Sequence, residues 1–86
     1  MNTKNKLPKW FEGQLYDKGD TVANPFSGEE YKLNNVELSM YDFIIGSQMV
    51  FEMAPNTVTE QKVKDFQKGL DWFRKNNPEA YWVLLD

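Results

Sequence analysis

The sequence contains no cysteine and no histidine. Disulfides, thiolate nucleophiles, zinc sites built from cysteine or histidine, and Ser-His nucleophile activation are therefore excluded. Carboxylates, lysines, tyrosines and hydroxyls are left for chemistry, and a carboxylate site for Mg²⁺ or Ca²⁺ is the only metal site that this composition permits. We accordingly expect a protein that is not an enzyme, and we predict no cofactor and no bound metal.

Long apolar runs are also lacking, since none approaches the ~20 residues that a membrane-spanning helix needs. Lys4, Lys6 and Lys9 are not followed by an apolar segment, so the sequence shows no secretory signal and we expect a cytoplasmic protein. The chain has 86 residues, of which 41% are hydrophobic and 15% aromatic. This predicts one folded domain over residues 1–86 with a single core.

Arginine occurs once, at Arg74, and the net charge of −3 is unevenly spread. Residues 1–9 carry three lysines and no acid, whereas residues 10–61 carry two lysines and nine acids. The acidic middle block would repel a phosphate backbone, so nucleic-acid binding is not the leading interpretation. It remains an alternative for the basic side chains of the second predicted helix, which are Lys62, Lys64, Lys68, Arg74 and Lys75.

The first third of the chain shows short β-type patterns. We expect a disordered tail over residues 1–8 and a β region over residues 9–33. Side chains alternate between apolar and polar over residues 10–16, and residues 21–23 and 29–33 are two further short runs. Two or three such strands are not stable alone, so this small antiparallel meander or hairpin must pack on something apolar.

Four carboxylates flank the two turns of this region, at residues 17–20 and 24–28. They lack the Asp-x-Asp-x-Asp-Gly spacing of a calcium loop, so solvated turn carboxylates are favoured over a cation site. The four residues are Asp17, Asp20, Glu29 and Glu30.

Residues 34–54 are predicted to form the first helix. Asn34 is suited to the N-cap, Glu37 completes a capping box three residues later, and Pro55 limits the far end. At ~100° per residue the apolar side chains fall on two opposite faces. One face contains Val36, Met40, Phe43, Ile44, Ser47, Val50 and Phe51, and the other contains Leu38, Tyr41, Ile45 and Met49.

Two interpretations of the second face stay open. It packs on the N-terminal strands while the first face packs on the second helix, or it is covered by another protein chain. Leaving four such side chains in water is unfavourable, because their burial contributes on the order of 6–10 kcal/mol before entropy costs.

Residues 57–77 are predicted to form the second helix, with Thr57 and Thr59 as competing N-caps. Its apolar residues form one seam, and Gly69 lies within the helix. The first helix also contains a glycine, Gly46. The two glycines indicate either that the two helix backbones approach closely or that each glycine is simply tolerated. The seam consists of Val63, Phe66, Leu70 and Phe73.

Residues 78–86 form an apolar C-terminal segment, for which Asn77-Pro78 favours a short helix over an added strand. The predicted fold is thus α+β, with a short N-terminal antiparallel β element packed on an antiparallel two-helix hairpin and closed by this segment. Trp72 points away from the seam of its helix, so partner contact and plain exposure are both open. The predicted partner-binding residues are Leu38, Tyr41, Ile45, Met49 and Trp72.

Three segments resemble small uncharacterised proteins of tailed marine phages, especially those of cyanobacteria. These are residues 19–29 with the Asn-Pro-Phe-Ser-Gly turn, residues 37–46 with Tyr-Asp-Phe-Ile, and residues 69–80. The resemblance implies a setting in the cytoplasm of a bacterial host or in a virion, and it assigns no catalytic residue. Together with the two apolar faces, it leads us to expect protein–protein association, with a second copy in a homodimer or with a host or phage protein.

Overall fold

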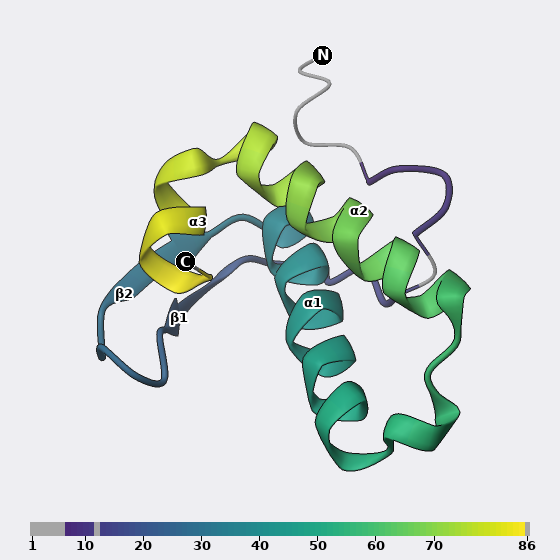
Figure 1. Ribbon diagram of the computed structural model, residues 1–86. Coiled ribbons are helices and arrows are strands. Elements are labelled where there is room, and N and C mark those ends of the chain that lie inside the picture. The colour runs from purple at the N-terminus through teal and green to yellow at the C-terminus, as the bar shows by residue number, and fades with distance from the viewer. Residues whose placement is uncertain (1–6, 12, 86) are drawn as a thin grey trace.

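The computed structural model describes residues 7–11 and 13–85, and Figure 1 shows its arrangement. A two-stranded antiparallel sheet and three helices confirm the α+β class. In chain order the elements are β1 (Asp20–Ala23), β2 (Glu30–Leu33), α1 (Asn35–Met53), the 3₁₀ turn η2 (Pro55–Thr57), α2 (Glu60–Asn76) and α3 (Pro78–Leu84).

The β element is a single hairpin in which Asp20 pairs with Leu33 and Ala23 with Glu30. The third strand predicted over residues 10–16 is wrong, because no described residue of that segment belongs to a strand. Instead, the chain turns where the Phe11 amide donates to the Pro8 carbonyl at 3.1 Å. The apolar alternation in this segment reflects aromatic rings that pack on helix α1 rather than a strand.

Helix α1 begins as its sequence predicts. The Asn34 side chain accepts from the Glu37 amide at 2.8 Å, and the Glu37 carboxylate accepts from the Asn34 amide at 3.0 Å. This reciprocal pair satisfies two amides that a helix start leaves unpaired. The helix continues without a break through Asp42 to Met53.

The other helix starts are also set by side-chain caps. Thr59 caps α2 by accepting from the Lys62 amide, which decides between the two predicted starts. Thr57 lies in η2, where its hydroxyl donates to the Ala54 carbonyl. Asn77 caps α3 and accepts from the Ala80 amide, with Pro78 in the first turn. The short C-terminal helix is therefore confirmed.

The core lies where the start of α1 meets the end of α2, strand β2 and helix α3 (Figure 1). Gly69 is buried there, and a Cβ on it would lie 3.3 Å from both Ile44 Cγ1 and Met40 Sδ. The predicted close approach at Gly69 is thus to side chains of α1, and Gly46 is not opposite it. The buried apolar residues are Leu33, Val36, Met40, Ile44, Phe73, Ala80 and Leu84.

Most of the predicted disordered tail, residues 1–6, lies outside the described residues. Leu7 is described, and it packs partly buried against the core cluster. The N-terminal segment therefore contributes to the fold at least from Leu7 onward. Among the described residues, no helix combines the length and the apolar character that spanning a bilayer requires.

Candidate interaction surface

The second apolar face of α1 divides into two parts. Leu38 and Tyr41 are partly buried against the core cluster, with the Tyr41 ring centroid 6.4 Å from that of Phe73. Ile45 is partly buried, whereas Met49 is 54% exposed. The first two predicted partner-binding residues are therefore covered within the chain, although Tyr41 meets Phe73 of α2 where the sequence analysis expected the N-terminal strands. A solvent-facing surface remains beyond them.

This surface extends further along the helix than the sequence pattern indicated. Met53 is 79% exposed and follows Ile45 and Met49 at intervals of four residues. Residues spaced by four lie one above the other on a helix, so the three side chains form one stripe. We call Ile45, Met49 and Met53 the distal face of α1. The structure leaves it largely uncovered by the described chain.

Trp72, the fifth predicted partner-binding residue, is partly buried and packs against the core cluster. Its ring lies edge-on to that of Phe73, with 6.3 Å between the ring centroids. Plain exposure of Trp72 is therefore wrong, and its side chain contributes to the fold. It does not join the distal face of α1.

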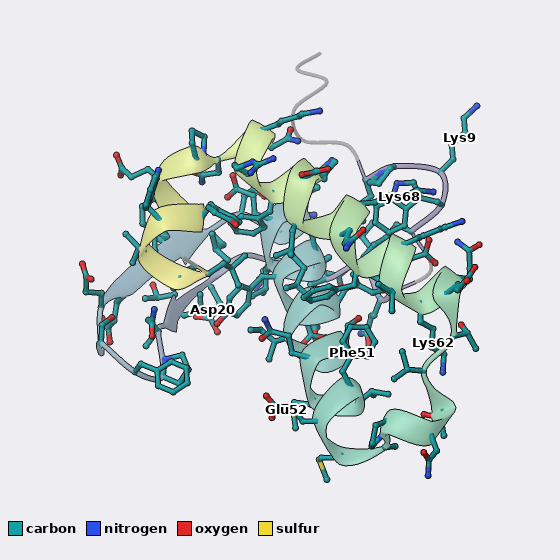
Figure 2. The ribbon with its side chains drawn as sticks, in the orientation of Figure 1. Lys9, Asp20, Phe51, Glu52, Lys62 and Lys68 are labelled. Atoms are coloured by element: carbon teal, nitrogen blue, oxygen red, sulfur yellow. The ribbon has the colours of Figure 1, made fainter. Side chains whose placement is uncertain are left out.

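A second feature is a groove between α1, the first half of α2 and the N-terminal segment, with a volume of about 470 Å³. Phe51 is labelled in Figure 2 where α1 faces α2, and its ring lies edge-on to that of Phe66 at 5.2 Å. We call this feature the aromatic groove. Its lining residues are Trp10, Asp42, Phe43, Gly46, Ser47, Val50, Phe51, Lys62 and Asp65.

Three rings at one end of the groove are fixed by contacts with one another. The Phe43 ring lies 5.8 Å from Trp10 and 5.6 Å from Phe11, measured between centroids. The Lys68 ammonium lies 5.9 Å from the Trp10 ring centroid, within cation–π range. In Figure 2 the Lys9 side chain extends away from the rest of the molecule. The groove thus has aromatic walls, Lys62 in its lining and Lys68 next to Trp10.

The acidic groups of the groove have donors within the chain. Asp65 accepts from the Gln61 side chain at 2.8 Å. Asp42 is the hydrogen-bond partner of the Tyr16 hydroxyl, and this bond is the main cause that raises the pKa of Tyr16 above its ordinary value. Lys62 donates to the Thr57 carbonyl at 3.3 Å. The groove therefore has an ordered polar rim.

The basic residues of α2, proposed for the nucleic-acid alternative, are interrupted by acids. Arg74 forms an ion pair with Asp71 at 2.8 Å, and both side chains are more than half exposed. Glu60 and Asp65 lie between or beside the lysines on the same helix. A phosphate backbone would meet mixed charge along α2 rather than a continuous basic face.

The four turn carboxylates do not form a cluster. Asp20 accepts from the neighbouring Thr21 amide at 2.7 Å, which is a local turn interaction. Within residues 7–11 and 13–85, no group of three or more acidic side chains is placed to hold a metal ion.

Phe26 is 97% exposed in the turn between β1 and β2, although the sequence favours the core for an aromatic residue such as this one. Its exposure depends on how the hairpin lies relative to the helices, and no local pattern contains that information. The Asn24 side chain attaches this turn to α3 by donating to the Val83 carbonyl at 3.0 Å. No protein-family model matches the chain, and neither curated proteins nor solved structures gave a significant match.

Proposed function

We propose that this protein is a non-enzymatic association module that forms a homodimer through the distal face of α1. The observation that carries the proposal is the exposure of Met49 and Met53 on the same stripe as Ile45. Full burial of an apolar side chain of this size contributes about 1.5–3 kcal/mol, so covering the stripe is favourable. A second copy supplies an identical stripe.

A two-fold axis near Met49 would pair two α1 helices in antiparallel fashion. In that arrangement Ile45 of one copy meets Met53 of the other, and Met49 meets its own counterpart. Methionine suits such a contact because its flexible side chain fills irregular spaces. One helix face is smaller than the ~800 Å² per partner of standard interfaces, so we expect a dissociation constant in the micromolar range.

Met49→Glu tests the dimer directly, because it places a carboxylate on the proposed axis. We expect the dimer to be lost in sedimentation velocity at all concentrations at which the unmodified chain dimerises. Since Met49 is 54% exposed, the melting temperature at low concentration should change little. Gln67→Glu is the matched control, because it adds the same charge at an exposed site of α2.

A dimer that persists in Met49→Glu while Gln67→Glu behaves like the unmodified chain would contradict the proposal. So would a chain that stays monomeric from low to high micromolar concentration. Either result would leave the distal face without the assigned role.

The setting of the proposal rests on the resemblance to small phage proteins. We propose that the chain acts in the cytoplasm of a bacterial host or in the phage particle, as a non-catalytic component. Mass spectrometry of purified virions and of infected-cell extracts distinguishes the two locations. Absence from both would remove the phage setting without affecting the dimer.

The nucleic-acid alternative makes a separate prediction. Binding through the basic residues of α2 would weaken steeply as salt is added, because it depends on the release of counterions from the phosphates. These residues are Lys62, Lys64, Lys68, Arg74 and Lys75. A gel-shift or fluorescence-anisotropy measurement with DNA and RNA at low salt tests it. No change in either measurement would exclude this alternative.

A further inference from the structure

Helix α1 contains three methionines that differ in their access to solvent. Met49 and Met53 are exposed on the distal face, whereas Met40 is fully buried. Met40 belongs to the core cluster, but Met49 and Met53 are not among the described residues that form this cluster or pack against it. The same thioether group is therefore present on one helix in a protected and in an accessible form.

The end of α1 that carries the two exposed methionines is open to solvent. Gln48 and Glu52, which directly precede them in the helix, are also exposed. In Figure 2 the Glu52 side chain extends from α1 on the side away from α2. A small polar reagent in solution can therefore reach both thioether sulfurs of the single chain.

Hydrogen peroxide is a reagent that converts an accessible thioether to a sulfoxide. A lone pair of the methionine sulfur attacks one peroxide oxygen, an S–O bond forms, the O–O bond breaks, and water leaves. The sulfur loses two electrons and the peroxide gains them. Methionine sulfoxide reductases restore the thioether, so the modification is reversible.

The sulfoxide would change the character of the distal face. A flexible apolar side chain becomes a polar one, with an oxygen that accepts hydrogen bonds. Ile45, Met49 and Met53 have no side-chain donor for this oxygen. Burial between two copies would leave the oxygen unpaired, and an unpaired buried polar group typically weakens an interaction by about tenfold or more.

The same change should leave the core intact. Because Met49 and Met53 lie outside the core cluster, a sulfoxide at either position stays in water in the single chain. The Met40 sulfur is enclosed instead, since it lies 3.3 Å from the place of a Cβ on Gly69. Oxidation of the distal face would therefore separate two copies without unfolding either of them.

We propose that Met49 and Met53 are a peroxide-sensitive modification site, and that their conversion to sulfoxides separates the homodimer. The site regulates the dimer proposed above and therefore rests on that proposal. Peroxide acts on the single chain, because the dimer buries Met49 on its axis. Association consequently protects the thioethers, and the oxidation rate of Met49 should fall as the protein concentration rises through the dissociation constant.

The experiment treats the unmodified chain with hydrogen peroxide until Met49 and Met53 are oxidised and Met40 is not, as established by tandem mass spectrometry. Sedimentation velocity then compares the dissociation constant of the dimer before and after treatment. We expect it to rise by about tenfold or more, with an unchanged circular dichroism spectrum. Treatment with a methionine sulfoxide reductase and its reductant should restore the original dissociation constant.

Two matched variants separate the distal face from other oxidisable side chains. Met40→Leu keeps both distal methionines and should respond to peroxide as the unmodified chain does. The double variant Met49→Leu/Met53→Leu keeps Met40 and all three tryptophans, and its dimer should not respond, because leucine has no sulfur. Each variant is compared with its own untreated sample, so that any effect of leucine on the dimer is removed from the comparison.

The possible results distinguish this proposal from the homodimer itself. A chain that is monomeric before any peroxide is added would contradict the homodimer, and the modification site with it. A dimer whose dissociation constant stays the same after both distal methionines are oxidised would overturn the modification site alone. So would oxidation of Met40 as fast as that of Met49, or a loss of dimer that the reductase does not reverse.

Discussion

The two ends of the helix pair α1 and α2 differ in how many of their side chains are buried. The first half of α1 contains all four of that helix's buried residues, and the second half of α2 contains Gly69 and Phe73, the two buried residues of that helix. The opposite halves have exposed apolar side chains at Met49, Met53 and Val63. One pair of helices thus provides a packed core at one end and an exposed apolar surface at the other.

This difference arises because the β1–β2 hairpin and helix α3 cover only one end of the helix pair α1 and α2. Strand β2 and helix α3 contact each other and lie against the start of α1 and the end of α2 (Figure 1). The helices continue beyond this cover with the same apolar spacing. The apolar pattern of a helix therefore indicates which of its faces tends to be buried. The length of the covering elements decides how much of that face is buried within the same chain.

The largest expected effect compares two phenylalanines of α2. Phe73 is fully buried, so Phe73→Ala should lower the free energy of unfolding by about 3–5 kcal/mol. Phe66 lies seven positions earlier on the same side of the helix and is only partly buried. Phe66→Ala should therefore lower the free energy of unfolding clearly less. Urea titrations at low concentration measure both. Equal losses would mean that the core extends along the whole hairpin.

A smaller effect compares the two helical glycines. Gly46→Ala should raise the free energy of unfolding by about 1 kcal/mol, because alanine favours the helix and its methyl group meets open space. Gly69→Ala should give no such gain, since its methyl group would press on Ile44 and Met40. Thermal melts of both variants test the contrast. A stabilised Gly69→Ala would show that the packed end is looser than the structure indicates.

The smallest effect concerns pH. Burial raises the pKa of Tyr41 above its ordinary value of 10.0. Above about pH 10 the unfolded chain loses this proton first, so stability should fall as the pH rises, and it should be unaffected by Tyr41 below that pH. Tyr41→Phe should make the fall shallower in urea titrations from about pH 9 to about pH 11. An unchanged slope would place Tyr41 in solvent.

Local signals in the sequence were sufficient for the helices. Each helix start is capped by residues within one turn of chain, as the sequence predicts. The caps are Asn34 with Glu37 for α1, Thr59 for α2, and Asn77 with Pro78 for α3. Alternation at residues 10–16 was not sufficient for a strand, because a strand also needs a partner. Trp10 and Phe11 pack on Phe43 instead.

The candidate surfaces were predictable only in part. The spacing of Leu38, Tyr41, Ile45 and Met49 identified an apolar face of α1 that is exposed at Met49, but not the point at which the core ends. That point depends on elements distant in sequence. The aromatic groove and Phe26 involve residues from several elements, so helix periodicity alone contained no signal for either.

The bond between the Asn24 side chain and the Val83 carbonyl has a consequence for biosynthesis. The two residues are 59 positions apart, so at ~5–20 residues per second the ribosome adds Val83 roughly 3–12 s after Asn24. During that interval the nascent hairpin lacks its attachment to α3. During this stage, when chaperones can bind the growing chain, Phe26 is exposed on a hairpin that is not yet bonded to α3.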